Sequence, residues 1–228
     1  MRIKKIVFDF DGVLTKGGEP LKEQAWDFMA DLWSGQAKKW LGEARLKFGQ
    51  GKGSRFDILK YVILRFGHTE AFDDVLVPAY AECYDQIVQR LLVDSGLAEH
   101  AEELLDSLQT FRFELYVNSA TPTPGLLKSL QALRIDDYFE KILGWPNRKL
   151  ENLRIVRSST PAAEPKEIVF VGDGENDWKA AKDFGCHFVG MANSWNNWGE
   201  RRPKGMPKYC LISDLQEIPK KIALFEKK

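Results

Sequence analysis

The segment IKKIVFDFDGVLT, residues Ile3–Thr15, decides how the rest of the chain is interpreted. Its apolar first half predicts a short buried β-strand that ends at Asp9. Because side chains on an extended segment alternate with a period of two, Asp9 and Asp11 leave this strand on the same side, and Gly12 permits a sharp turn directly after them. Two such carboxylates can bind a hard cation such as Mg²⁺, can divide nucleophilic and acid–base work, or can simply form a turn that ends the strand.

The composition is that of a folded protein with no net charge. Of the 228 residues, 44% are hydrophobic and 12% aromatic, enough for one large core or for a core and a smaller module. The 33 basic and 33 acidic residues cancel, which argues against a dedicated nucleic-acid binder.

Cysteine usage and hydropathy bear on the cellular compartment. Cys83, Cys186 and Cys210 are scattered and form no CxxC motif, which is typical of reduced thiols in an intracellular protein. The apolar run near the N-terminus is too short for a signal peptide, and no run approaches the roughly 18 residues of a membrane span. We therefore expect a cytoplasmic protein with no membrane segment, no nucleic-acid partner and no obligate protein partner.

Residues 16–95 show the three- and four-residue apolar spacing of helices and no strand pattern. The dipeptide Ser34-Gly35 is expected to divide the first helical stretch in two. Trp26, Trp33 and Trp40 recur every seven residues, and we interpret them as core packing rather than as a ligand-stacking face. A helical block of this length exceeds a normal connection between strands and indicates an inserted module.

A glycine-rich stretch inside this block precedes a second helix-start signal. Ser54 and Asp57 have the spacing of a capping box, and Gly67 is placed to end the helix that they begin. Lys52 and Arg55 therefore lie at a helix N-terminus, a position that favours anions. An ordinary solvated helix start explains the same pattern.

The second half of the chain returns to strand patterning at Phe113–Val117. This strand is followed by Ser119 and Ala120, whose hydroxyl and backbone N–H could seat an oxyanion or a phosphate, or could only cap the next helix. After a linking stretch, 142–149, Lys149 begins another helix, and most lysines in such positions are simply solvated.

A third strand, Ile168–Val171, runs into the sequence GDGEND at 172–177. Three acidic residues crowd the end of this strand, and crowded carboxylates raise the electrostatic energy unless a cation neutralises them. Two short strands, 187–189 and 209–212, and a terminal helix follow. The intervening loop at Trp195–Trp198 is interpreted as a solvated surface or as the rim of an active site.

Short apolar strands that alternate with helices predict an α/β protein with a parallel sheet. Ligands of such sheets bind beyond the carboxyl ends of the strands. The polar residues singled out above all follow strand ends: Asp9, Asp11, Ser119, Asp173 and Asp177. We therefore expect them to converge on one site.

The motifs DFDGVLT (9–15), the strand before Ser119, Lys149 and GDGEND (172–177) together resemble the haloacid dehalogenase superfamily of phosphohydrolases, over nearly the whole chain. The segment GSRFDIL (53–59) is similar to the cap loop of the branch that contains β-phosphoglucomutase and phosphoglycolate phosphatase. The resemblance implies a Rossmann-like core of residues 1–15 and 96–228, with an all-helical cap of residues 16–95 inserted after the first strand.

The resemblance also implies roles for single residues. Asp9 is expected to be the nucleophile that becomes an aspartyl-phosphate, and Asp11 the general acid and base. Ser119, Ala120 and Lys149 are expected to hold the phosphoryl oxygens.

The implied cofactor is Mg²⁺. Its expected ligands are the following aspartates, the second through its backbone carbonyl and the last directly or through water: Asp9, Asp11, Asp173 and Asp177. Lys52 and Arg55 of the cap are expected to select the substrate. The expected activity is that of a Mg²⁺-dependent phosphatase acting on a small phosphorylated metabolite, with a phosphomutase or a catalytically silent phosphometabolite-binding protein as alternatives.

Overall fold

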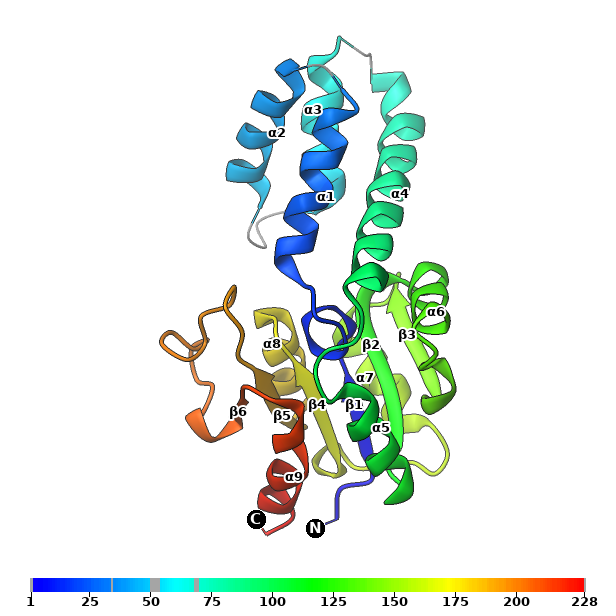
Figure 1. The fold of residues 1–228 in the computed structure, drawn as a ribbon, viewed down its shortest axis with the longest axis vertical. Helices are drawn as coiled ribbons and strands as arrows, with labels where there is room; N and C mark the ends of the chain where they lie inside the picture. Colours follow the sequence, from blue (N-terminus) through cyan, green and yellow to red (C-terminus); the bar gives the residue numbers. More distant parts are fainter. Residues whose placement is uncertain (1, 34, 50–53, 68–69, 228) are drawn as a thin grey trace. The chain divides into compact units, whose positions relative to one another are not determined.

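A computed structural model describes residues 2–33, 35–49, 54–67 and 70–227, without the side chains of 70–73. Within these residues, six strands form one parallel sheet in the order β3-β2-β1-β4-β5-β6 (Figure 1). The strands are β1 (Lys5–Phe8), β2 (Glu114–Pro122), β3 (Lys141–Trp145), β4 (Ile168–Gly172), β5 (His187–Met191) and β6 (Leu211–Ile212). The predicted α/β class with a parallel sheet is confirmed.

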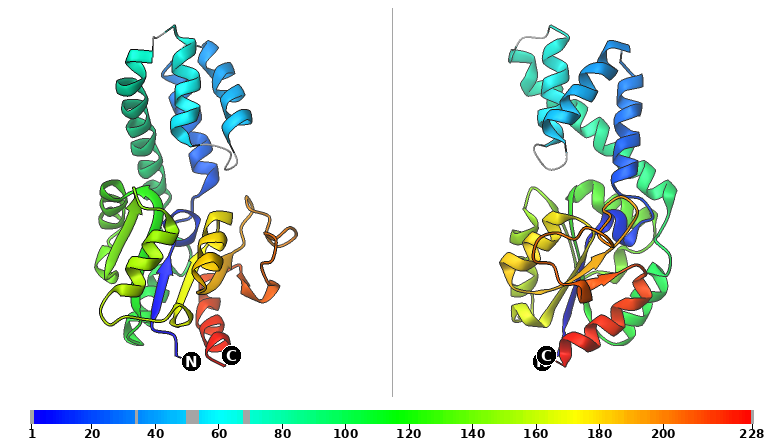
Figure 2. Two further views of the ribbon diagram at one scale, coloured as in Figure 1. Left: turned by 180° about the vertical axis from the view of Figure 1, so that it is seen from behind. Right: turned by 90° about the vertical axis from the view of Figure 1, so that its left-hand side faces the viewer.

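The helices divide between the sheet and a separate helical segment. The four helices of the first half of the chain are α1 (Glu19–Asp31), α2 (Gly35–Phe48), α3 (Arg55–Arg65) and α4 (Glu70–Ser95). The helices that follow are α5 (Ala101–Thr110), α6 (Thr123–Ala132), α7 (Lys149–Ser158), α8 (Glu175–Phe184) and α9 (Ile218–Glu226). Figure 2 shows α7 and α8 on one face of the sheet and α5 and α9 on the other.

The chain forms two compact units, one of Met1–Glu19 and Leu92–Lys228 and the other of Pro20–Leu91. The first contains the sheet, and the second consists of α1–α3 and most of α4. The boundaries expected from the sequence, at 15/16 and 95/96, lie a few residues away from these. Within the described residues, no helix combines the length and apolarity needed to cross a bilayer.

The central strands explain the layered arrangement of the first unit. Every residue of β1 and β4 is buried, as expected where helices cover both faces of a parallel sheet. Phe8 at the end of β1 pairs with Val117 of β2 and with Val171 of β4. The residues that follow these three positions therefore emerge together at one edge of the sheet.

The helical unit packs around aromatic rings. Trp26 stacks on Tyr84 with ring centroids 4.0 Å apart, and Trp33 and Trp40 meet the ring of Phe66 edge-on. These contacts agree with the interpretation of the three tryptophans as packing residues. Since α1 ends before Ser34-Gly35 and α2 begins at that glycine, the expected division of the helix is confirmed.

The capping box is also confirmed. The Ser54 hydroxyl accepts the Asp57 N–H, and the Asp57 carboxylate accepts the Ser54 N–H, so both ends of the motif are paired. The helix ends at Arg65, and Gly67 follows with a φ of 81°, a conformation that favours glycine.

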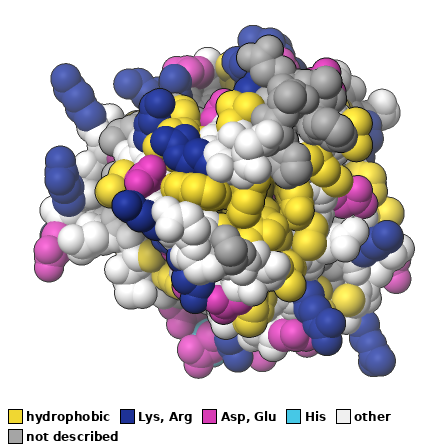
Figure 3. All heavy atoms as spheres, turned by 90° about the horizontal axis from the view of Figure 1, so that it is seen from above, with side chains coloured by type: hydrophobic (Ala, Val, Ile, Leu, Met, Phe, Trp, Pro, Cys, Tyr) yellow, Lys and Arg dark blue, Asp and Glu magenta, His cyan; other side chains and the backbone are white. Residues whose placement is uncertain are grey.

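Part of the apolar surface of the helical unit remains exposed. In Figure 3, which shows the molecule from above, hydrophobic side chains gather near the centre of the view, with basic side chains beside them. Exposed large apolar residues of the unit are Phe28, Leu32, Leu46, Leu64, Phe66 and Val75. A module of this size has too little interior to bury all of its apolar side chains.

Two predicted boundaries are wrong. Residues of the linking stretch form the edge strand β3, and β2 continues to Pro122 because its end pairs with Trp145 of β3. Ser119 and Ala120 therefore lie inside β2 and not after it.

Candidate active site and metal centre

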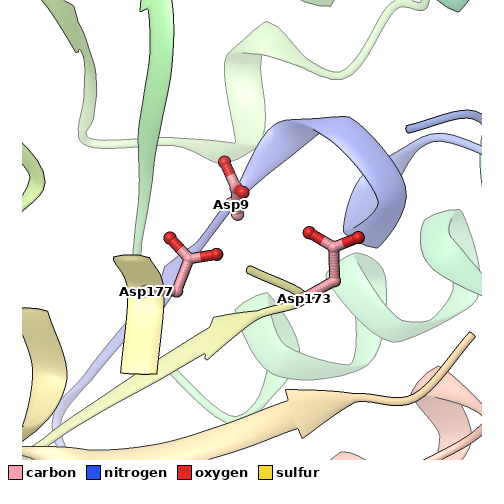
Figure 4. A group of neighbouring side chains, drawn as sticks. All are labelled: Asp9, Asp173 and Asp177. Atoms are coloured by element: carbon pink, nitrogen blue, oxygen red, sulfur yellow. The ribbon is translucent and has the colours of Figure 1, made fainter. Parts of the chain in front are cut away.

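Three carboxylates meet at the carboxyl edge of the sheet (Figure 4). Asp9 follows β1, Asp173 follows β4, and Asp177 lies in the first turn of α8. One carboxylate oxygen from each lies within 4.8 Å of the other two. Asp9 is 6% and Asp177 1% exposed, while Asp173 is half-buried. We call these three residues the acid cluster.

The backbone brings the members of the acid cluster together. The Asp9 N–H donates to the Val171 carbonyl at 2.8 Å, which extends the pairing of β1 with β4 by one residue. Gly172 then makes room for Asp177, because a Cβ on Gly172 would lie 2.4 Å from the Asp177 Cβ. The Asp177 carboxylate also accepts the Gly174 N–H at 2.9 Å, which orients it at the start of α8.

Lys149 supplies the positive charge of the site. Its Nζ lies 2.8 Å from Asp9 Oδ2 and also contacts Asp177 Oδ1. The first turn of α7, which carries this lysine, is held by Asn118 of β2, whose Nδ2 donates to the Lys149 carbonyl at 2.9 Å. Asn152 donates to the Asn118 amide oxygen at 3.0 Å, and both asparagines are fully buried.

The charges at the site do not balance. At an effective dielectric constant of about 20, two carboxylate charges separated by 4.8 Å, the upper limit within the cluster, repel by about 3.5 kcal/mol. Burial, followed by the charge of Asp177, raises the pKa of Asp9 to about 7, although Lys149 acts in the opposite direction. Burial lowers the pKa of Lys149, but the charges of Asp177 and Asp9 outweigh it and leave this pKa above its usual value.

The donor set fits Mg²⁺. Three carboxylates outnumber the single ammonium of Lys149, and hard oxygen ligands are those that Mg²⁺ prefers. A divalent cation would remove the excess negative charge. The residues that could hold it are therefore Asp9, Asp173 and Asp177.

Asp11 lies beside the acid cluster and is not one of its three members. It is 6% exposed and belongs to the wide turn Phe10–Leu14 that follows Asp9. Gly12 in this turn has a φ of 74°, and a Cβ on it would lie 2.5 Å from Asp173 Oδ2. Only glycine therefore lets the turn come this close to Asp173.

Ser119 and Ala120 lie two and three residues beyond Val117, at the same edge of the sheet as Asp9. Ser119 is buried, and its hydroxyl oxygen accepts the Thr121 N–H at 3.1 Å, whereas Ala120 is exposed. The structure thus brings the predicted phosphate-binding residues of β2 to the edge where Asp9 and Lys149 lie.

The two basic residues assigned to the cap lie in or next to α3. Arg55 forms an ion pair of 2.9 Å with Asp85 of α4 and packs on the ring of Phe56. Its charge is therefore already paired within the helical unit. Lys52 lies outside the described residues.

Two side chains of the loop after β5 contact the acid cluster, and neither was assigned a role from the sequence. Asn193 Nδ2 and Trp195 Nε1 each donate to Asp173 Oδ2 at 2.9 Å. Of the two interpretations of this loop, the contacts favour the rim of the site. Its position after a neighbouring parallel strand was the only signal in the sequence that could have indicated this.

A comparison with protein-family models identifies the class of protein to which this fold and site belong. Residues 3–185 match the model of the haloacid dehalogenase-like hydrolases. The chain therefore belongs to this family, and the predicted resemblance is confirmed.

Curated relatives include the phosphoglycolate phosphatase of Escherichia coli strain K12, which is 34% identical over 126 residues. The match covers 52% of this chain and 49% of that enzyme, so the chain spans about half the length of the relative that it matches. The phosphoglycolate phosphatase of Salmonella typhi is 34% identical over 109 residues, covering 46% of this chain and 42% of that enzyme.

Solved structures share the fold over almost the whole chain. A predicted phosphoglycolate phosphatase from Haemophilus somnus has a TM-score of 0.68 at 22% identity, covering 96% of this chain and 98% of its own. The β-phosphoglucomutase of Clostridium difficile has a TM-score of 0.66 at 17% identity, covering 99% and 100%. The shared fold agrees with the class expected from the sequence, a Rossmann-like parallel sheet core with an inserted all-helical domain.

Proposed function

We propose that this protein is a Mg²⁺-dependent phosphatase that hydrolyses a small phosphorylated metabolite through an aspartyl-phosphate on Asp9. The observation that carries the proposal is the position of Asp9, which belongs to the acid cluster and also contacts the ammonium of Lys149. A carboxylate that attacks a phosphate must approach a group of the same charge. Flanking cations offset this repulsion, and phosphoryl transfer otherwise depends mainly on positioning.

In the first step, an oxygen of Asp9 attacks phosphorus and the bond to the leaving oxygen breaks. Asp11 donates a proton to that oxygen, so the alcohol leaves neutral. In the second step, Asp11 takes a proton from a water that attacks the same phosphorus, the bond to Asp9 breaks, and inorganic phosphate is released. Asp9 and Asp11 return to their initial states.

The other residues of the site would orient the phosphoryl group. Lys149 carries a positive charge that its contacts with Asp9 and Asp177 maintain, and it would hold one phosphoryl oxygen. The Ser119 hydroxyl and the Ala120 N–H would hold others. Mg²⁺, when bound by Asp9, Asp173 and Asp177 and by the Asp11 backbone carbonyl, would supply charge neutralisation.

The substrate is proposed to be small and anionic. The curated relatives named phosphoglycolate phosphatase support a short phosphorylated acid as the first candidate. Domain 16–95 is proposed to act as the cap that selects it, with Lys52 and Arg55 as specificity residues. Because Arg55 is paired with Asp85, it would have to exchange this partner for a substrate anion.

A phosphate-release screen tests the proposal. Phosphoglycolate, sugar phosphates, polyol phosphates and nucleotides would be incubated with the full chain, with Mg²⁺ or with EDTA. We expect Mg²⁺-dependent release from at least one ester, no release by Asp9→Asn, and unchanged release by Asp183→Asn, which alters an exposed aspartate of α8 in the same way.

The outcomes separate the alternatives. A requirement for a sugar bisphosphate as activator, with transfer in place of release, would identify a phosphomutase. Binding of phosphate esters without turnover would identify a catalytically silent relative. Full activity of Asp9→Asn would refute the assignment of the nucleophile.

A further inference from the structure

Trp195 connects three parts of the first unit that are far apart in the sequence. Its indole Nε1 donates to Asp173 Oδ2 at 2.9 Å, and Asn193 Nδ2 donates to the same oxygen at the same distance. Its ring lies beside two glycines: a Cβ on Gly12 would be 3.0 Å, and a Cβ on Gly18 2.8 Å, from the ring atom Cζ2. Gly12 belongs to the turn after Asp9, and Gly18 precedes α1, the first helix of the helical unit.

The loop that carries Trp195 is held in place by its own hydrogen bonds. Asn196 Oδ1 accepts the Asn193 N–H at 3.1 Å, and Asn193 Oδ1 accepts the Asn196 N–H at 3.0 Å. Asn196 Nδ2 also donates to the carbonyls of Asp173 and Met191, at 3.0 and 2.8 Å. Trp198, directly after this turn, is 2% exposed and packs into the core. Trp195 is therefore presented to Asp173 from a loop anchored on both sides.

The position of Asp173 needs such support. It has to bring its carboxylate close to those of Asp9 and Asp177, which repel it in the absence of a cation. Two N–H donors on one oxygen fix the rotation of a carboxylate and offset part of its charge. Outer hydrogen-bond partners of this kind orient metal ligands and strengthen metal binding.

We propose that Trp195 is a positioning residue of the metal centre. Its indole N–H holds the Asp173 carboxylate in the orientation that binds the ion, and the close approach of Gly12 and Gly18 to its ring sets the position of the indole. The inference rests on the proposed function, because it assumes that the acid cluster binds Mg²⁺. It predicts that a methyl group added at Gly18 weakens ion binding although Gly18 is no ligand, because the methyl displaces the ring.

Isothermal titration of the metal-free full chain with MgCl₂ tests the proposal. Trp195→Phe removes the N–H and keeps an aromatic ring, and we expect its Kd for Mg²⁺ to be about tenfold to a hundredfold higher, the effect of one hydrogen bond to a charged group. Trp33→Phe is the matched control, since that ring packs on Phe66 and Tyr80, and its Kd should equal that of the wild type.

Gly18→Ala provides a second arm that leaves the tryptophan in place. It should raise the Kd by about threefold or more, because the closest contact of the new methyl is the ring. A phenyl ring at position 195 lacks the indole atom Cζ2, so Gly18→Ala should have no further effect in the Trp195→Phe background. Gly199→Ala is the control, because a Cβ there meets nothing within 4 Å.

The outcomes distinguish the two proposals. If the wild type binds no Mg²⁺, the metal centre of the proposed function fails, and the inference fails with it. If the wild type binds Mg²⁺ and both Trp195→Phe and Gly18→Ala bind it equally well, the inference alone is overturned. Circular dichroism in EDTA checks that the variants are folded; if Trp195→Phe is not, the Gly18→Ala result decides.

Discussion

Lys149 Nζ lies 2.8 Å from Asp9 Oδ2, so the ammonium group directly faces the carboxylate that is proposed to attack phosphorus. The two residues are far apart in the sequence and meet because β1 is central in the sheet and α7 begins at the same edge. Lys149 also contacts Asp177, and it therefore stabilises two members of the acid cluster at once.

Replacement of Lys149 by methionine tests this relationship. The variant keeps the length of the side chain and removes its charge, so Asp9 and Asp177 lose their shared partner. We expect kcat/KM for phosphate release to fall by about 10²–10³-fold, the range typical for loss of one group that stabilises transition-state charge. The exposed Lys179 of α8 is the control, and Lys179→Met should be neutral. Equal activity of the two variants would contradict the role of Lys149.

The stability of the metal-free protein should depend on pH through Asp9. Burial raises the pKa of Asp9 from 3.8 to about 7, so the folded state retains a proton that the unfolded state releases. This group's contribution to stability is therefore complete below about pH 4 and is lost as the pH rises to about 7. We expect Asp9→Asn, which cannot ionise, to melt higher than the wild type in EDTA at pH 8, and the difference to shrink at pH 4. A lower melting temperature of the variant at pH 8 would contradict the pKa shift.

Mg²⁺ should reverse the order of the melting temperatures of the wild type and Asp9→Asn at pH 8. An ion that binds only the folded state stabilises it according to its concentration and affinity. We expect MgCl₂ at pH 8 to raise the melting temperature of the wild type and to have little effect on Asp9→Asn, which has one fewer carboxylate in the acid cluster. The same shift in both proteins would place the ion elsewhere.

The capping box of α3 predicts a local effect on stability. Ser54→Ala leaves the Asp57 N–H without its side-chain acceptor and should cost about 1 kcal/mol of unfolding free energy, measured by urea titration. The Ser54 N–H, and then its hydroxyl, hold the pKa of Asp57 below 3.8. The Ser54 hydroxyl also donates to the ionised Asp57 carboxylate, and the stability that this bond contributes is fully present above pH 3.8. It is lost as the pH falls through the lowered pKa of Asp57. The loss from Ser54→Ala should therefore be smaller at about pH 2 than at pH 7.

Ser158→Ala is the control for the capping experiment. The Ser158 hydroxyl donates to the Ile155 carbonyl at the C-terminal end of α7, and it accepts no helix N–H in this bond. It should change the unfolding free energy by much less than Ser54→Ala at pH 7.

The buried cysteines should resist modification. Burial raises the pKa of Cys186 to about 12, so almost no thiolate forms near neutral pH, and Cys210 is 4% exposed. Mass spectrometry after iodoacetamide treatment at pH 7.5 should find both thiols unmodified in the folded protein and modified in urea. Rapid labelling of Cys186 in the folded protein would contradict its placement in the core.

The sequence by itself determined the central strands, the capping box and the order of the acidic motifs. These features are local: a strand such as β4 is recognisable from its own apolar residues, and Ser54 and Asp57 pair across a single helical turn. The pattern at Asp9, Asp173 and Asp177 was sufficient to predict that they converge, since parallel strands end at one edge.

Only the tertiary structure decided the features that depend on distant partners. The edge strand β3 forms because it pairs with β2, and the loop at Trp195 reaches Asp173, 22 residues away in the chain, because β4 and β5 are neighbours. Arg55, assigned to substrate selection from its helix start, pairs with Asp85 because α3 and α4 fold into one unit. Contacts of this kind leave no periodic signal in the sequence, since their energy comes from residues that only the fold brings together.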